Sequence, residues 1–93
     1  MITIKLFPIV GSFAEDKDKA RDIRIRSIIP VLSKGEDIII DFDNVDEVTQ
    51  SFTHALISDL IRNYGIDVLD RVSFANCNKT VSKVIEIVVD YMQ

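Results

Sequence analysis

One short run of isoleucines does most to limit the folds open to this chain. Residues 36–42 read EDIIIDF. An unbroken apolar run of this length is typical of a strand with both faces covered, which places it at the centre of a sheet. Such strands are joined to parallel neighbours by helical crossovers. The run therefore predicts an α/β domain.

The segments on either side alternate between strand and helix patterns. Residues 2–7 (ITIKLF) and 71–77 (RVSFANC) show the period-two alternation of strands. Residues 49–65 and 78–92 carry apolar side chains at helical spacing. Residues 16–35 show a mixed pattern, since IRIRSI (residues 23–28) also alternates like a strand; a helix is predicted there because a crossover is needed between two apolar strands. The order is βαβαβα, which predicts a small, mostly parallel sheet packed by helices, with right-handed crossovers.

Helix boundaries can also be predicted from single residues. Thr49 and Asn78 offer side-chain acceptors at the starts of the second and third helices. Gly35 and Gly65 follow the last turns of the first and second helices, where a glycine is favoured. Pro30 lies inside the first helix and should kink or interrupt its last turn, because proline lacks the backbone donor.

The last helix is more apolar than a helix covering three short strands requires. Ile87 and Val89 lie at the edges of its apolar stripe. Packing against the first strand is the favoured explanation, and a homodimer contact through this helix is the alternative. The stripe itself consists of Val81, Val84, Ile85, Val88 and Met92.

Length, charge and cysteine content exclude several classes of protein. The 93 residues fit one domain, residues 1–93. The net charge of -4 disfavours nucleic acid as a partner. A single cysteine, Cys77, allows no internal disulfide or multi-cysteine metal site and suits the cytoplasm. The start MITIKLFPIVG fits neither a signal peptide nor a membrane span, so no membrane association is expected.

One stretch is locally basic. Residues 16–26 hold five cations with three acids among them, which leaves a local excess of two positive charges. An ordinary solvated helix face is the favoured explanation, and a patch for an acidic partner is the alternative. The cations are Lys17, Lys19, Arg21, Arg24 and Arg26.

Four carboxylates follow the central strand with no basic residue among them: Asp41, Asp43, Asp46 and Glu47. They do not fit a calcium loop, because its sixth and twelfth positions hold Asp46 and Phe52 in place of Gly and Glu. An apolar strand ending in Asp-x-Asp resembles the first motif of haloacid-dehalogenase-type phosphatases, in which the first aspartate, here Asp41, is a nucleophile beside magnesium. No acidic pair follows to complete the metal site, which counts against this resemblance. A small magnesium-dependent phosphatase using Asp41 and Asp43 is therefore kept only as the rival hypothesis.

Other catalytic patterns are weaker. His54 is the only histidine, and a pair with Cys77 would need a third group to orient the base. An exposed or capping histidine and a buried, inert thiol are favoured. No catalytic residue, metal ligand or cofactor is therefore expected, and the chain is not expected to be an enzyme.

The second half of the chain resembles the STAS-like domain family of unknown function. The pattern is an apolar strand ending Asp-Phe, a Val three residues later, Ser-Phe opening a helix, a Tyr-Gly helix end, and a strand ending in Asn. It spans about residues 36–86. The matching positions are Asp41, Phe42, Val45, Ser51, Phe52, Tyr64, Gly65 and Asn76.

That family is similar to STAS domains, the bacterial anti-sigma-factor antagonists. There the start of the corresponding helix carries Asp-Ser-Ser-Gly, and a partner kinase phosphorylates the first Ser to switch partner binding. In this chain the tetrad falls on residues 49–52. Gln50 stands in the position of the phosphorylated first Ser, and Ser51 matches the second Ser. His54 and Ala55 stand where many family members carry an acidic pair.

The resemblance implies a non-enzymatic regulatory module that docks on another protein, an ATPase- or kinase-type regulator, through residues 41–51 and the exposed face of the following helix. The negative loop suits a basic partner. A phosphate on Ser51 or Thr49 would repel part of what the loop binds, since acids are adjacent. The expected contact residues are Asp41, Asp43, Asn44, Asp46, Glu47, Thr49, Gln50, Ser51 and His54.

A structural role for the same loop, as a well-capped turn, is favoured over a ligand site. Asp41, Asp43 or Asn44, and Thr49 or Ser51 can accept hydrogen bonds from backbone donors left free at the strand end and the helix start. The loop would then be a well-capped turn with no ligand.

Overall fold

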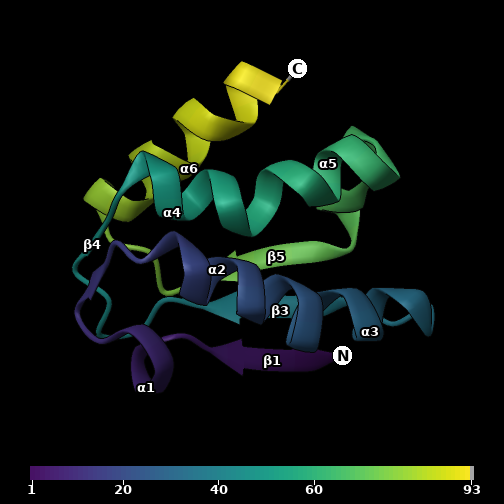
Figure 1. Cartoon of the computed structure of the whole chain (residues 1–93), viewed down its shortest axis with the longest axis horizontal. Coiled ribbons are helices and arrows are strands. Elements are labelled where there is room, and N and C mark those ends of the chain that lie inside the picture. The colour runs from purple at the N-terminus through teal and green to yellow at the C-terminus, as the bar shows by residue number, and fades with distance from the viewer. Residues whose placement is uncertain (93) are drawn as a thin grey trace.

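The computed structural model describes residues 1–92 and contains the alternating strands and helices that the sequence predicts (Figure 1). A short helix, a pair of two-residue strands and three irregular helical turns are added to them. The elements are β1 (Ile2–Lys5), α1 (Phe7–Val10), β2 (Phe13–Ala14), α2 (Lys17–Ile23), η1 (Arg24–Ile28), α3 (Ile29–Ser33), β3 (Ile38–Asp41), β4 (Glu47–Val48), α4 (Gln50–Thr53), η2 (His54–Ser58), α5 (Asp59–Tyr64), η3 (Ile66–Asp70), β5 (Val72–Ala75) and α6 (Lys79–Met92).

The main sheet has three parallel strands in the order β1-β3-β5. The isoleucine strand β3 is therefore central, as predicted. The register places Ile38 between Ile2 and Val72, and Asp41 between Lys5 and Ala75. Side chains of alternate residues point to opposite faces, so the sheet has one apolar face and one polar face.

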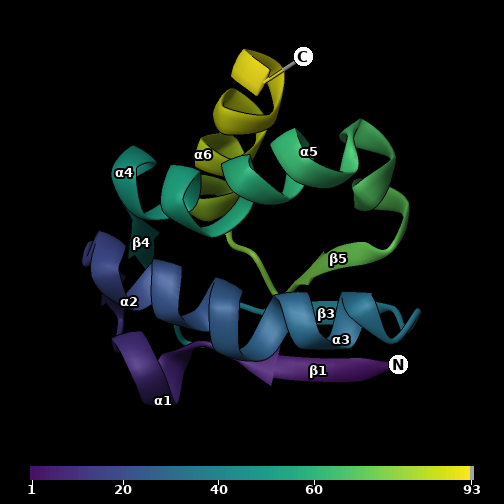
Figure 2. The same cartoon turned by 45° about the vertical axis from the view of Figure 1, so that its right-hand side comes forward.

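Helices cover only the apolar face. Strand order follows chain order, so both crossovers move in the same direction across the sheet, and two right-handed crossovers of that kind lie on the same side. Figures 1 and 2 show α2 to α6 on that side. Ile38 and Ile40 are fully buried, whereas Thr3, Lys5 and Ser73 on the outer face are exposed. The prediction that the central strand is covered on both faces is therefore wrong.

The first long helix contains a widened turn just before its proline. α2 continues through the π-helical turn η1 into α3, and the backbone N–H of Ile29 donates to the carbonyl of Arg24, five residues earlier. In an α-helix the ring of Pro30 would press against the carbonyl four residues before it. The interruption predicted from Pro30 is thus present, but as a π turn before the proline.

The second long helix also contains a π turn, η2, although it has no proline. Within it the hydroxyl of Ser58 donates to the carbonyl of His54. Arg24, at the start of η1, donates to the carbonyl of Ala55 in η2 and lies 3.1 Å from the carboxylate of Asp59. The two π turns are therefore joined by one arginine, whose side chain is 11% exposed.

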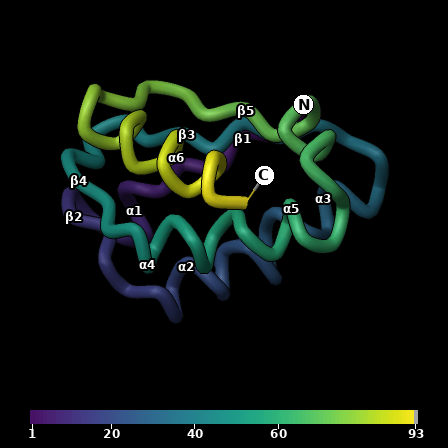
Figure 3. Tube along the Cα trace, turned by 90° about the horizontal axis from the view of Figure 1, so that it is seen from above, coloured from purple at the N-terminus to yellow at the C-terminus, as the bar shows by residue number. Residues whose placement is uncertain are grey.

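The last helix buries the predicted stripe but packs on different elements. Val81, Ile85 and Val88 are buried. The main contacts of α6 are with α4, η2 and β4, and in Figure 3 it lies beside α4 on the helical side of the sheet. The prediction that it packs mainly against the first strand is wrong. Ile87 remains 43% exposed.

Candidate functional site

The acid-rich turn begins where β3 ends, at Asp41. Its carboxylate accepts hydrogen bonds from the backbone N–H of Asp43 and from Nδ2 of Asn76, both at 2.9 Å. The hydrogen bond from Asn76 does most to lower the pKa of Asp41, and the N–H of Asp43 and the charge of Lys5 lower it further. Asp41 therefore holds the ends of β3 and β5 together as an anion.

Two buried side chains anchor the turn that follows. Phe42 and Val45 are buried, and the N–H of Val45 donates to the carbonyl of Phe42 at 2.9 Å. Between them Asn44 has a φ of 67°, a left-handed conformation that Asn tolerates better than most residues. Asp43 and Asn44 are thereby held out in solvent.

Hydrogen bonds also fix the rest of this acidic loop, by which we mean residues 43–47. The N–H groups of Asp46 and Glu47 donate to the carbonyl of Ser12 at 2.8 and 3.2 Å. Nδ2 of Asn78 donates to the carbonyl of Asp46 at 2.9 Å, while Oδ1 of Asn78 accepts from the N–H of Val81 and caps α6, as predicted. The backbone of the loop is thus held at Asp46 and Glu47 by residues that lie just before β2 and α6.

The carboxylates of the acidic loop are exposed and uncompensated. Asp43, Asp46 and Glu47 are all exposed to solvent. The ion pairs within residues 1–92 are Arg24–Asp59, Arg62–Asp59 and Arg71–Asp37, and none of them involves the loop. The loop therefore presents three negative charges on a rigid backbone.

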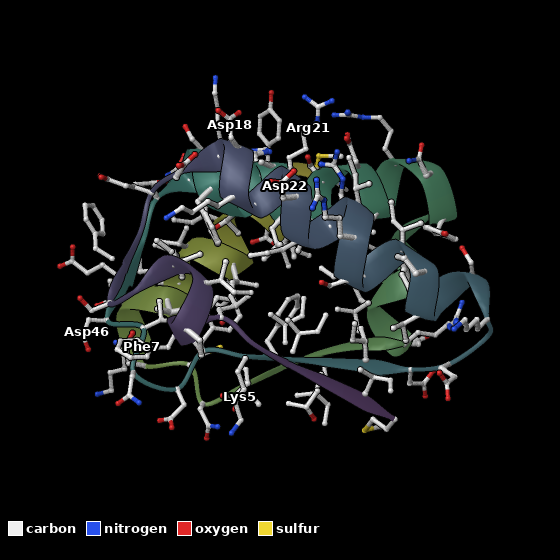
Figure 4. All side chains as sticks on the ribbon, turned by 60° about the horizontal axis from the view of Figure 1, so that its bottom comes forward. Lys5, Phe7, Asp18, Arg21, Asp22 and Asp46 are labelled. Atoms are coloured by element: carbon white, nitrogen blue, oxygen red, sulfur yellow. The ribbon has the colours of Figure 1, made fainter. Side chains whose placement is uncertain are left out.

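Exposed aromatic side chains flank these charges. Phe13 in β2 pairs in register with Glu47 and is 47% exposed. Phe7 in α1 is 42% exposed and lines a hollow of about 130 Å³ together with Lys5 and Asp43. Figure 4 shows Phe7 and Asp46 at the same end of the molecule. We call Phe7 and Phe13 the aromatic flank.

The helix that follows the loop begins with the predicted cap. Oγ1 of Thr49 accepts from the N–H of Phe52 at 3.0 Å, and Oγ1 of Thr53 donates to the carbonyl of Thr49 at 3.0 Å. Thr49 is half-buried, whereas Gln50 and Ser51 are exposed in the first turn of α4. Of the two candidate phosphoacceptors, Ser51 is thus the accessible one.

His54 lies apart from the acidic loop. It lines a separate hollow of about 610 Å³, formed by α2 and η2, with Lys17 and Arg21. Its ring meets that of Tyr91 edge-on, with the centroids 5.5 Å apart. The structure therefore groups Asp41, Asp43 and Asn44 around one hollow and His54 around another.

Sequence reasoning missed several residues of this surface. Lys5, Asn76 and the aromatic flank were not among the expected contacts. Aligning the predicted parallel strands would have placed Lys5 beside Asp41, with Asn76 directly after the neighbouring strand end. No pattern in the sequence indicates that Phe13 pairs with Glu47, because two-residue strands depend on tertiary packing.

Neither a metal site nor a Cys-His pair is assembled within the described residues. Within residues 1–92, no three His, Cys, Asp or Glu side chains are placed to hold a metal ion. Cys77 is half-buried, and this burial raises the pKa of its thiol. Cys77 and His54 line different hollows. None of the helices in this part of the chain has the length and apolar character needed to cross a bilayer.

A family model matches most of this chain. The family model of the STAS-like domain of unknown function (DUF4325) matches residues 19–82, which is more than half of the chain. The match includes the π turns, the acidic loop and the start of α6. No curated protein and no solved structure matches. The chain belongs to the family of STAS-like domains of unknown function.

Proposed function

We propose that this chain is a non-enzymatic regulatory module that binds a partner protein through the acidic loop and the aromatic flank. The observation that carries the proposal is the combination of three uncompensated carboxylates with two exposed phenylalanines on a backbone fixed by hydrogen bonds. Buried aromatic side chains and charged rims are the two components typical of protein interfaces.

The rigidity of the loop favours binding. Ordering a flexible loop on association costs free energy, and a loop already held in place avoids that cost. The negative charge selects a partner with a basic surface and speeds the encounter at low salt. A basic patch on the surface of a larger regulator would offer the opposite charge that the acidic loop requires.

The partner we propose is an ATPase- or kinase-type regulator, on the basis of the family resemblance. Phosphorylation of Ser51 would switch the interaction, since the phosphate would be four residues along the chain from Glu47 and add to the negative charge of the acidic loop. Intact-mass analysis of the chain from its native cells should show one added phosphate that is lost in Ser51→Ala. Mass unchanged under every growth condition would indicate a constitutive binder.

Charge reversal tests the docking surface. The variant Asp43→Lys, Asp46→Lys, Glu47→Lys should retain less of the partner in an affinity pull-down, by roughly tenfold or more. The matched control is Glu36→Lys, Asp67→Lys, Asp70→Lys, which makes the same change in net charge at exposed positions preceding β3 and β5. Equal recovery of the same partner by both variants would refute the proposal.

The non-enzymatic part of the proposal has its own test. A phosphatase built on Asp41 would turn over an aryl phosphate with magnesium and lose that activity in Asp41→Asn. We expect wild type and Asp41→Asn to show the same background rate, because the carboxylate of Asp41 is engaged by Asn76 and the backbone of Asp43. Magnesium-dependent turnover that vanishes in the variant would establish the enzyme instead.

A further inference from the structure

The hollow between α2 and η2 has the opposite character to the acidic loop. We call it the basic hollow and define it by Lys17, Arg21, Arg24 and His54; Asp18, Ala55, Ser58 and Asp59 complete its lining. Lys17, Arg21 and Arg24 are spaced by four and three residues, so they lie along one face of the helix. Figure 4 shows Asp18 and Arg21 at the top of the view, on the helices, and Phe7 and Asp46 at its lower left.

The charge balance of the basic hollow is positive. Asp59 is 3.1 Å from Arg24 and 2.8 Å from Arg62, so its charge is already compensated. Arg24 is fixed there by its bonds to Ala55 and Asp59. Lys17 and Arg21 are exposed and take part in none of the ion pairs within residues 1–92. The lining holds three cations, Lys17, Arg21 and Arg24, and two acids, Asp18 and Asp59, so its net charge is +1 in a chain whose net charge is -4.

The basic hollow also has an exposed aromatic neighbour. Tyr91 is 77% exposed and holds its ring edge-on against His54. The acidic loop has a comparable neighbour in the aromatic flank. The two surfaces are therefore complementary in charge and alike in offering aromatic area, which is the composition expected of two halves of one interface.

We infer that the occupant of the basic hollow is the acidic loop of a second copy of this chain. Asp43, Asp46 and Glu47 of one copy would pair with Lys17 and Arg21 of the next, with the aromatic flank against Tyr91. The two surfaces differ, so the contact is head-to-tail and each copy keeps one surface of each kind free. This inference rests on the proposed role of the acidic loop in docking and adds a second copy of the chain to the partners of that loop; a loop left free at the end of a head-to-tail assembly can still bind the regulator.

Sedimentation velocity over a range of protein concentrations tests the association. The weight-average mass of wild type should rise with concentration in low salt and fall back towards the monomer in about 1 M salt, where the Debye length is about 3 Å. Lys17→Glu, Arg21→Glu should weaken the association constant by roughly tenfold or more. Arg26→Glu, Lys34→Glu, at exposed positions outside the basic hollow, should leave it close to wild type.

Mixing two variants gives the decisive result. The loop variant Asp43→Lys, Asp46→Lys, Glu47→Lys and the hollow variant Lys17→Glu, Arg21→Glu should each be monomeric, since each brings like charges together. A mixture should associate again, because each reversed surface then meets one of opposite sign. Association of neither wild type nor the mixture would overturn the inference.

The outcome is separable from that of the proposed function. A chain that stays monomeric but loses a distinct partner in the loop variant would refute self-association and leave the docking role intact. Self-association that survives in the unmixed loop variant would place the contact between copies elsewhere, and would also overturn the inference. Circular dichroism checks that the variants are folded.

Discussion

Arg24 bridges the two π turns with a single guanidinium that is largely buried. Arg24→Met should lower the free energy of unfolding by about 1–3 kcal/mol, since it leaves the carbonyl of Ala55 without this donor. Arg24→Lys should also destabilise, because an ammonium cannot reproduce the planar fork. Urea denaturation measures both.

The matched control for this arginine is Arg62, which pairs with the same carboxylate but has a side chain that is 64% exposed. Arg62→Met should cost about 0–1 kcal/mol, as surface ion pairs do. A loss as large as that of Arg24→Met would mean that the pairing with Asp59, and not the bridge to Ala55, carries the effect.

Asp41 should make stability depend on pH. Its pKa is lowered in the folded state, so the carboxylate stabilises the fold above the ordinary value of 3.8, and this contribution is lost as pH falls through the folded value. Wild type should therefore exceed Asp41→Asn in stability near neutral pH, and the difference should shrink as the pH is lowered below 3.8.

Asn76 provides the control for that pH dependence. Its hydrogen bond is the main cause of the lowered pKa, and its φ of 57° favours glycine as the replacement. In the background of Asn76→Gly, the loss of stability caused by Asp41→Asn should depend less on pH than it does in the wild-type background. An undiminished pH dependence in that background would assign the effect to the backbone of Asp43 instead.

At the scale of elements, the start of α4 offers the clearest test. Thr49→Ala removes the acceptor for the N–H of Phe52 and should lower the free energy of unfolding by about 1 kcal/mol. Thr49→Ser keeps a hydroxyl acceptor and should retain most of the wild-type free energy of unfolding. Gln50→Ala, at the next and exposed position, should change it little. Thermal denaturation followed by circular dichroism would measure the series, and equal melting of Thr49→Ala and wild type would contradict the cap.

Elements were predictable where local chemistry decides them. Thr49 and Asn78 accept the predicted capping bonds, and Gly35 and Gly65 have positive φ after their helices. An interruption of the first long helix was predictable from Pro30, but the π turn η2, which has no proline, and the β2–β4 pair were not. The β2–β4 pair depends on residues distant in sequence, such as Phe13 with Glu47. Local propensity carries no information on such contacts.

At the scale of the whole molecule, the strand order leaves the outer edge of β1 free among the described residues. The N–H of Ile2 donates to Asp37, just before β3, and the N–H of Leu6 donates to Asp41, so by alternation the N–H of Ile4 also points toward β3. The N–H groups of Thr3 and Lys5 point to the free edge. Amide exchange should be at least about tenfold slower at Ile4 than at Thr3 and Lys5. Equal protection of all three, measured by NMR, would mean that a further strand covers this edge.

The whole-molecule arrangement also shows where sequence reasoning was too coarse. The run of Ile38, Ile39 and Ile40 suggested two covered faces, but Ile39 points to the outer face and is only half-buried. The parallel sheet and its central strand could be predicted from apolar runs and alternation. The open face could not, because it follows from the strand order, which the sequence pattern does not determine.

A strand order that never reverses has a consequence for how such a domain can diversify. Open α/β sheets hold small molecules in the crevice created where the order of strands changes direction, and this sheet has no such point. Under the proposed function, recognition falls to the exposed side chains of the acidic loop, which is anchored by the buried Phe42 and Val45. Partner choice can therefore change by exchanging a few outward charges, without disturbing the packed interior on which folding depends.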